Sequence, residues 1–265
     1  MLDSHIHPDN WGIRPILFSI GNIGIPSYAF FVALGLIVGL CIYFYESKKQ
    51  KKMNDNGIFI VVGALLGGAL GAKILGFIVN FDYLIANINN PAAFLSGRTI
   101  VGGFIGGVIG AILTKRILKI NENRGNFFAP AIAIGVAIGR LGCFFVGCCY
   151  GKATNLPWGV DFGDHISRHP TQLYESLFML LMFIYLEKIK NRKDIMPGQL
   201  LKILMMSYFI FRFLIDFIKV EPAIFAGLTI FQIISFVAVV FIARDDIKKL
   251  FIKLKDKKQY VNESK

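Results

Sequence analysis

The sequence predicts an all-α integral membrane protein with about seven transmembrane helices, an exterior N-terminus and a cytoplasmic C-terminus. Three observations predict it: an excess of apolar residues, seven long apolar runs, and basic residues concentrated after alternate runs. Of the 265 residues, 55% are hydrophobic and 17% are charged, whereas a soluble domain carries about 25% charged residues. The mean hydropathy is +0.58. This composition argues against a soluble globular protein and against a disordered chain.

A helix that crosses a membrane needs about 20 mostly apolar residues. Turn-forming residues, such as those at 54–57 and 196–198, separate several of the apolar runs. The seven runs cover residues 27–45, 57–80, 99–114, 127–147, 171–187, 198–219 and 223–243.

Glycines are dense in the second and third runs, and several are spaced four residues apart, as at 63–71 and 102–110. This spacing places small residues on one helix face and allows two backbones to approach closely. We therefore expect these glycine-bearing faces to pack closely against other helices. A flexible gate is the alternative interpretation.

The net charge of +12 could by itself indicate a nucleic-acid partner, but its distribution argues otherwise. Twenty of the 29 Lys and Arg residues follow the first, third, fifth and seventh runs. All twenty therefore lie on one side of the membrane, and the positive-inside rule makes that side cytoplasmic. These residues orient the chain and contact anionic membrane lipids, and no nucleic-acid partner is expected.

We expect one transmembrane domain over residues 1–245, with residues 148–170 as its longest exterior loop. Residues 246–265 are expected to form a basic cytoplasmic tail, in which Ile247 to Leu254 lie as an interfacial helix. No cleavable signal peptide is visible at the N-terminus.

Three cations lie within the apolar runs: Lys73, Arg140 and Arg212. Each precedes the outer end of its run by seven residues, which is roughly 10 Å below the outer boundary. A charge at membrane depth usually faces a polar interior and serves function. One interpretation is a pocket for a lipid phosphate, which guanidinium groups bind bidentately. The other is an intramembrane ion-pair cluster, with Asp216 one turn after Arg212 as a partner.

Two stretches, residues 139–151 and 168–175, carry a more specific pattern. The first begins Gly-Arg-Leu-Gly-Cys-Phe and ends Tyr-Gly, and the second reads Arg-His-Pro-Thr-Gln-Leu-Tyr-Glu. They resemble the signatures of bacterial prolipoprotein diacylglyceryl transferases, which have a Gly-Arg-x-Gly-Asn-Phe run and a later His-Pro-Ser-Gln-Leu-Tyr-Glu run. The resemblance extends over roughly residues 15–245.

The resemblance implies a reaction, its partners and its location. The family transfers the diacylglyceryl group of phosphatidylglycerol to the lipobox cysteine thiol of a prolipoprotein and releases glycerol 1-phosphate. It acts at the outer face of the bacterial cytoplasmic membrane and uses no metal or soluble cofactor. The implied partners are phosphatidylglycerol, the lipobox segment and membrane lipids.

Arg140 and Arg212 are the expected catalytic residues, because preorganised cations stabilise the negative charge that develops on a leaving phosphate. His169, like Glu175, is expected mainly to fix the exterior loop to the fifth helix. The residues that stand at the family's substrate-binding positions are Tyr28, Lys73, Gly102, Gly103, Cys143, Gly151, His169, Tyr208 and Asp216.

The sequence departs from the family pattern at several positions. Val101 precedes the paired glycines, where many members have a His that is a candidate base. Cys143 stands in place of an Asn and Cys148 in place of an acidic residue, while Lys219 replaces an Arg and Asp216 a Glu. The thiol-activating base is therefore not identified by the motif.

Cys143, Cys148 and Cys149 allow three interpretations. They are small packing residues, a redox or covalent-transfer site, or metal ligands together with His165 or His169, although their spacing is not a standard zinc pattern. Two alternative functions follow from these departures. One is a divergent transferase with another acceptor or with its own thiols, and the other is a non-catalytic lipid-binding or transport protein.

Overall fold

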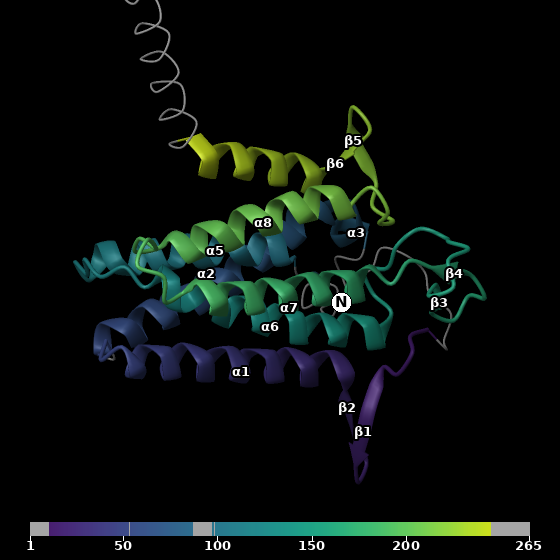
Figure 1. Cartoon of the computed structure of the whole chain (residues 1–265). Coiled ribbons are helices and arrows are strands. Elements are labelled where there is room, and N and C mark those ends of the chain that lie inside the picture. Colours follow the sequence, from purple (N-terminus) through teal and green to yellow (C-terminus); the bar gives the residue numbers. More distant parts are fainter. Residues whose placement is uncertain (1–10, 53, 87–96, 98, 245–265) are drawn as a thin grey trace, which may run out of the picture.

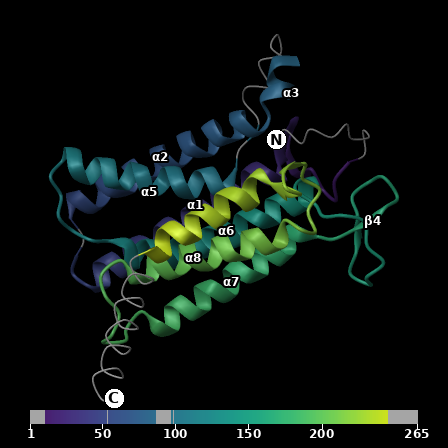
Figure 2. The ribbon, with the colours of Figure 1, turned by 90° about the horizontal axis from the view of Figure 1, so that it is seen from above.

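The computed structural model describes residues 11–52, 54–86, 97 and 99–244, and Figure 1 shows that most of them form one helical bundle. Seen from above, the long helices again lie alongside one another (Figure 2). The predicted interfacial helix in the basic tail lies outside the described residues. The helices are α1 (Ser27–Lys49), α2 (Asp55–Val79), α3 (Phe81–Ala86), α5 (Ile100–Ile117), α6 (Gly125–Val146), α7 (Thr171–Ile189), α8 (Gln199–Ile215) and a helix over Ile230–Arg244.

Four of these helices, α1, α2, α5 and α6, are long and apolar enough to cross a membrane. Their apolar surfaces are largely uncovered by protein, since only 11% of the most apolar window of α2 is buried. A water-soluble monomer rarely exposes so large an apolar surface. The predicted class, an all-α membrane protein, is confirmed by these four helices. That α7, α8 and the Ile230–Arg244 helix also cross the membrane stays a prediction.

Two predicted runs have different boundaries in the structure. α8 ends at Ile215, four residues before the end of the run predicted over 198–219. The first residues of the run predicted over 223–243 form a hairpin of β5 (Ala223–Phe225) and β6 (Leu228–Thr229), so that its helix starts at Ile230. The cause is the turn at Gly227, whose φ of +76° favours glycine.

The start of α2 and the start of α5 are fixed by side-chain caps. Asn54 accepts a hydrogen bond from the Gly57 amide at 3.0 Å, and Thr99 accepts one from the Gly102 amide at 3.2 Å. Asn and Thr are favoured at this position because their oxygens satisfy amides that lack a partner within the helix. The boundary predicted at residues 54–57 is thereby confirmed as a helix cap, with residues 55–57 in the first turn of α2.

α2 and α5 pack backbone to backbone. A Cβ added at Gly67 would lie 2.7 Å from the Cα of Gly110, and one at Gly71 would lie 2.7 Å from the Cα of Gly106. Only glycine permits this approach. The predicted close packing at these glycines is confirmed, and the structure shows that the two glycine-rich helices are each other's partners. α1 approaches α6 in the same way, since a Cβ at Gly39 would lie 2.8 Å from a carbonyl oxygen of α6.

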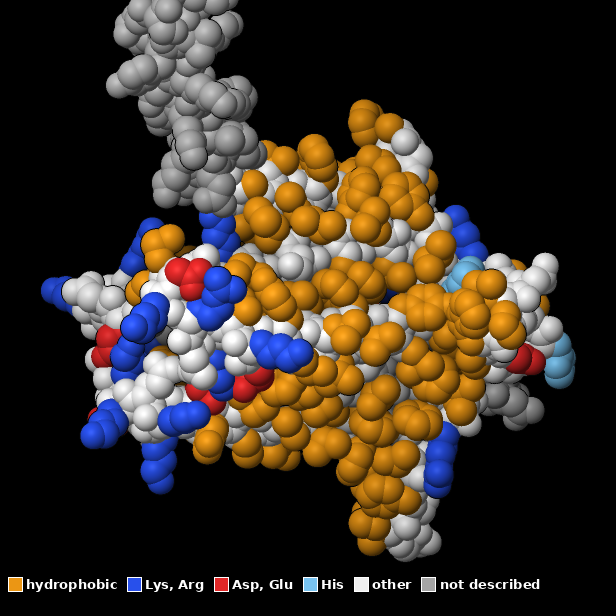
Figure 3. Space-filling model, in the orientation of Figure 1, with side chains coloured by type: hydrophobic (Ala, Val, Ile, Leu, Met, Phe, Trp, Pro, Cys, Tyr) orange, Lys and Arg blue, Asp and Glu red, His pale blue; other side chains and the backbone are white. Residues whose placement is uncertain are grey.

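The two ends of the bundle differ in character. The hairpin of β1 (Ile16–Ile20) and β2 (Ile23–Pro26), the pair of β3 (Val160–Asp161) and β4 (Ser167–Arg168), and the β5–β6 hairpin all lie at one end (Figure 1). We call this the hairpin end. Most of the Lys and Arg side chains visible in Figure 3 gather at the other end, beyond a broad apolar belt. α1, α5 and α7 each have basic residues in their last turn there.

The tightest core joins α5, α6, α7, α8 and the Ile230–Arg244 helix. Ala129, Met179, Leu204 and Tyr208 are completely buried within it. Close packing of this kind leaves few alternative rotamers. The core therefore fixes the facing sides of α6, α7 and α8, and these sides carry the polar residues described next.

Candidate active site

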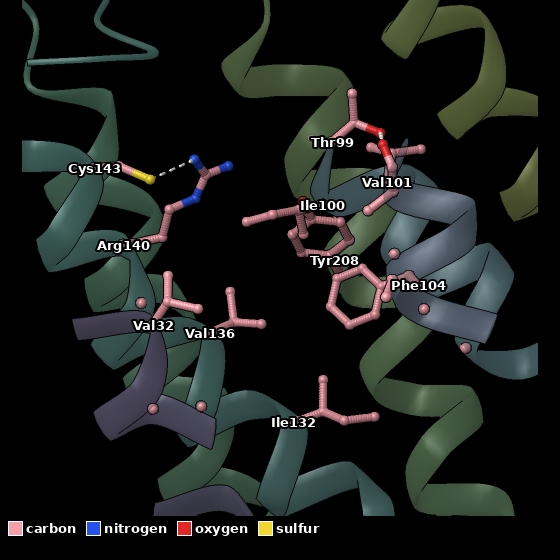
Figure 4. A pocket seen from close by; sticks show the side chains of 18 of the residues that line it. Val32, Thr99, Ile100, Val101, Phe104, Ile132, Val136, Arg140, Cys143 and Tyr208 are labelled. Atoms are coloured by element: carbon pink, nitrogen blue, oxygen red, sulfur yellow. Dashed lines mark hydrogen bonds between the residues drawn. The ribbon is translucent and has the colours of Figure 1, made fainter. Parts of the chain in front are cut away.

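A pocket of about 560 Å³ lies between α1, α2, α5, α6 and α8. Most of its wall is apolar, with residues such as Val32, Phe104 and Val136 facing it (Figure 4). Its charged groups come from α6, α8 and the segment after α8, toward the hairpin end. Among the described residues that line the pocket, the charged ones are Arg140, Arg212, Lys219 and Glu221.

Arg140 lies in the last two turns of α6 and is 4% exposed. Its Nη2 atom lies 2.6 Å from Oε1 of Glu175 on α7, and its Nη1 atom donates to the Cys143 sulfur at 3.7 Å. Figure 4 shows the side chain extending from α6 into the pocket beside Cys143. Its buried Nε atom has no hydrogen-bond partner among the described residues. The pair with Glu175 fixes the guanidinium and leaves one donor unused.

Arg212 lies in the last turn of α8 and is also 4% exposed. Its Nη2 atom lies 2.9 Å from Oδ1 of Asp216, so the predicted pair one turn apart is confirmed. Thr229 donates to the other carboxylate oxygen of Asp216 at 2.6 Å, and the guanidinium lies over the Phe231 ring at 4.7 Å. Asp216 thus serves mainly to hold Arg212.

The third cation at the pocket is Lys219 and not Lys73. Lys219 is 2% exposed and lines the pocket. Lys73 does not line it, and its Nζ atom lies 5.0 Å from the centre of the Phe77 ring. Ala69 and Ala72 face the pocket from α2, and each step along a helix turns the side chain by about 100°. Lys73 matches the expected depth but lies on a different face of α2.

Glu221, two residues after Lys219, supplies a carboxylate at the pocket. Its side chain is 24% exposed, and its Oε1 atom lies 4.0 Å from Nη2 of Arg212. It belongs to the loop between α8 and β5. Burial raises the pKa of Glu221 above its ordinary value, although Lys219 and Arg212 act in the opposite direction.

The predicted tyrosines and glycines are placed in different ways. Tyr28, Gly103 and Tyr208 line the pocket. The Tyr208 hydroxyl is buried and donates to Glu175 at 3.3 Å. Gly102 does not line the pocket and instead lets α5 approach α2, since a Cβ there would lie 2.8 Å from the Leu75 Cβ.

Cys143, Cys148 and Cys149 all line the pocket and carry free thiols. Cys148 donates to the Cys143 carbonyl oxygen at 3.4 Å. The Cys148 and Cys149 carbonyls accept from Gln172 and Thr171 of α7, each at 2.6 Å. Within the described part of the chain, no three His, Cys, Asp or Glu side chains are grouped so as to hold a metal ion.

Gly151 and His169 belong to the exterior loop and do not line the pocket. The Gly151 amide donates to the His169 carbonyl at 2.9 Å, and the His169 amide donates to the Lys152 carbonyl at 3.1 Å. A Cβ at Gly151 would lie 2.6 Å from the His169 Cβ and 2.7 Å from the Ile218 carbonyl oxygen. The His169 ring lies 3.3 Å from the Tyr174 hydroxyl of α7, and its loop-fixing role stays a prediction. The Lys152 amide donates to the Ile218 carbonyl at 2.7 Å and so tethers the loop to the segment that carries Lys219.

Comparison with known families decides the identity of this architecture. The model of the prolipoprotein diacylglyceryl transferase family matches residues 15–244. The chain belongs to this family. The resemblance of residues 139–151 and 168–175 to the family's signatures is therefore confirmed.

Several phosphatidylglycerol–prolipoprotein diacylglyceryl transferases are similar over most of their length. The Clostridium tetani protein is 31% identical over 79% of this chain and 87% of its own. The Finegoldia magna protein is 31% identical over 93% and 97%. The Wolbachia pipientis wMel protein is 33% identical over 79% and 83%.

Within this diacylglyceryl transferase architecture, Glu175 has a different place from the one expected. The sequence predicted that it fixes the exterior loop, but its carboxylate lies beneath the pocket on Arg140 and Tyr208. Lys219 and Glu221 were not among the expected site residues. One signal in the sequence could have found them. Two charged residues follow closely after Arg212 and Asp216, and the chain that leaves the end of α8 stays beside the pocket that Arg212 lines.

Proposed function

We propose that this protein transfers the diacylglyceryl group of phosphatidylglycerol to the lipobox cysteine thiol of prolipoproteins, with release of glycerol 1-phosphate. The observation that carries this proposal is the position of Arg140 and Arg212 at one end of an otherwise apolar pocket. A phospholipid has the same division, with apolar chains joined to an anionic phosphate. The apolar wall of the pocket therefore suits the acyl chains of a lipid donor, and the charged end suits its phosphate.

The chemistry needs negative charge to be stabilised on the leaving phosphate. The thiolate attacks the glyceryl carbon, a carbon–sulfur bond forms, and the carbon–oxygen bond to the phosphate breaks. Arg140 and Arg212 are held in place by Glu175 and Asp216, so their donors are oriented before the substrate arrives. Preorganised donors of this kind lower the barrier by several kcal/mol, about 2.7–4 for one oxyanion-type donor.

Lys219 adds a third positive charge to this end of the pocket. Tyr28, Gly103 and Cys143 lie where they would contact the donor lipid. Tyr208 supports Arg140 indirectly, because its hydroxyl donates to the Glu175 carboxylate that holds Arg140. Gly102, Gly151, His169 and Asp216 support the site through the packing and hydrogen bonds described above.

We further propose that all seven long helices cross the bacterial cytoplasmic membrane, with the hairpin end outside and the C-terminus inside. The concentration of most visible Lys and Arg side chains at the end opposite the hairpins (Figure 3) supports this orientation through the positive-inside rule. The pocket cations would then lie toward the outer leaflet, where the donor lipid and a secreted prolipoprotein meet.

The test uses the full-length protein purified in detergent, phosphatidylglycerol and a synthetic lipobox peptide. Glycerol phosphate release and the mass of the peptide are both measured. We expect one diacylglyceryl adduct per peptide and one glycerol phosphate per adduct. A folded preparation that yields no adduct would refute the proposal.

A divergent transferase with another acceptor is the second candidate, because Val101 and three cysteines line the pocket. The triple variant Cys143→Ser/Cys148→Ser/Cys149→Ser separates a chemical role of these thiols from a packing role. Full activity of the triple variant would make them packing residues. Phosphatidylglycerol consumption without any peptide adduct would favour another acceptor, and binding without consumption would favour a non-catalytic lipid-binding protein.

A further inference from the structure

Thiol transfer requires a group that takes the proton of the acceptor cysteine, and Val101 has no such group. Among the described residues that line the pocket, none is a His and Glu221 is the single carboxylate. We infer that Glu221 accepts the proton of the acceptor thiol. This inference rests on the proposed function and adds to it the identity of the general base.

The other acids near the pocket are already engaged. Glu175 is fully buried, with Arg140 and Tyr208 on one carboxylate oxygen. Asp216 accepts from Thr229 and pairs with Arg212, and it does not line the pocket. Glu221 differs because its side chain is 24% exposed and lies 4.0 Å from Arg212, at the outer limit of an ion pair. Its carboxylate is therefore accessible to a substrate within the pocket.

The position of Glu221 also suits the geometry of the displacement. In an in-line attack the thiol and the leaving phosphate lie on opposite sides of one carbon. A base beside the sulfur and a cation beside the leaving oxygen can both approach from the same flank of that carbon, and they are then near neighbours that do not form a tight ion pair. Glu221 and Arg212 have this relationship, and a general base must lie within hydrogen-bond reach of the proton that it takes.

The step balances without any further reactant. The thiol proton moves to a Glu221 oxygen as the sulfur attacks the glyceryl carbon, and the phosphate leaves with the electron pair of the carbon–oxygen bond. The proton then passes to the released phosphate monoester, whose second pKa is about 6. Burial raises the pKa of Glu221, and a carboxylate of higher pKa is a stronger base toward a thiol.

The groups that face Glu221 set its titration. They are Arg212 and Asp216 at the end of α8, Lys219 on its own segment, and Cys149 after α6. Among these groups Asp216 is the other carboxylate, and it does not line the pocket. Glu221 is therefore the carboxylate that can take a proton from a substrate there. We therefore expect the activity of the wild type to fall in acid as Glu221 becomes protonated.

The experiment compares the wild type with Glu221→Gln in the detergent assay with phosphatidylglycerol and the lipobox peptide, across about pH 5 to 9. We expect kcat at neutral pH to fall by about 10²–10⁴-fold, the usual contribution of a general base. The KM for phosphatidylglycerol should not rise, because removing this negative charge leaves Arg212 free to bind phosphate. The deficit should shrink toward about pH 9, where the free thiol, with a pKa near 8.5, ionises without help.

Glu187→Gln is the matched control, since Glu187 is a partly exposed carboxylate paired with Lys190 and lies away from the pocket. It should keep wild-type kcat. Glu221→Asp retains a carboxylate, so its activity should still fall in acid, at a reduced kcat. This variant tests the inference even if Glu221→Gln does not fold. A loss of the same size at every pH, or an Asp variant without an acidic limb, overturns the inference. An inactive wild type would instead refute the proposed function.

Discussion

Arg140 of α6 and Glu175 of α7 are joined by a 2.6 Å ion pair in which their side chains are 5% and 0% exposed. Two charges at this depth lose their hydration, and each compensates the charge of the other. The pair therefore connects two properties of the molecule: the packing of α6 on α7 and the positive charge at the pocket. Substitutions can separate these two properties.

Glu175→Gln removes the charge that compensates Arg140. Breaking a buried pair costs about 3–5 kcal/mol, so we expect a clear drop of the thermal unfolding midpoint in detergent. Asp194→Asn affects the pair with Arg192, in which the side chains are 65% and 62% exposed, and exposed pairs contribute about 0–1 kcal/mol. Equal midpoints for the two variants would show that the Arg140–Glu175 pair contributes little to stability.

The double variant Arg140→Met/Glu175→Leu removes both charges together. Apolar residues of similar volume replace buried ion pairs at little cost, and sometimes with a gain of about 1–4 kcal/mol. We expect a folded protein with a near-normal unfolding midpoint and no measurable transfer to the lipobox peptide. Substantial transfer by this variant would mean that the pair serves only the packing of the helices.

Lys219 and Lys73 offer a second comparison. Lys219→Met removes a cation from the pocket, and we expect kcat to fall by about 10²-fold, as for loss of one preorganised donor. Lys73→Met removes a cation that does not line the pocket and should change kcat less than threefold. The detergent assay at a fixed phosphatidylglycerol fraction measures both. A larger loss of kcat in Lys73→Met than in Lys219→Met would show that the phosphate binds beside α2 and Lys73.

Adjacent glycines test the contact between α2 and α5. A Cβ at Gly67 would lie 2.7 Å from the Gly110 Cα, whereas the nearest atom to a Cβ at Gly68 is 3.4 Å away. Gly67→Ala should therefore destabilise the protein by about 1–3 kcal/mol through overpacking, while Gly68→Ala should be tolerated. Thermal unfolding of both variants decides the point, and similar midpoints would contradict the close approach of the two backbones.

The basic end contains a pH-sensitive contact. Hydrogen bonds from Asn54, Arg124 and Asn56 hold the pKa of Glu122 below its usual value. A carboxylate with a lowered pKa stabilises the fold above its unfolded pKa of about 4.3, and this contribution is lost as pH falls through the folded pKa. We expect Glu122→Gln to lower the unfolding midpoint at neutral pH and to match the wild type once the pH has fallen below the folded pKa of Glu122. A midpoint difference that is constant with pH would refute this.

The positions of the helices could be predicted because length and apolarity are properties of the local sequence. The end of α8 could not, since Phe217 and Ile218 continue the apolar run beyond Ile215, where the helix stops. The hairpin over 223–229 is also apolar, and only its glycine turn reveals it. Apolarity alone does not distinguish a membrane helix from an apolar hairpin at the membrane surface.

The site could be predicted only in part, because the sequence gives the depth of a charged residue along its helix but not the direction of its side chain. Counting residues from the end of an apolar run gives the depth of a charge, and this count selected Arg140 and Arg212 correctly as residues that line the pocket. It does not give the direction in which a side chain points, and for this reason Lys73 was selected in place of Lys219. The place of Glu175 depends on how α7 is rotated against α6, which only the packed structure specifies.

The contact of α2 with α5 has a consequence for how a lipid would be held. Gly68, Gly103 and Gly107 line the pocket, so at these three positions the wall has no side-chain rotamers to reorder when an acyl chain arrives or departs. Ordering side chains costs about 0.5–1.5 kcal/mol for each flexible group, and these three positions avoid that cost. A lipid tail would pack there against bare helix backbone without restricting any side chain.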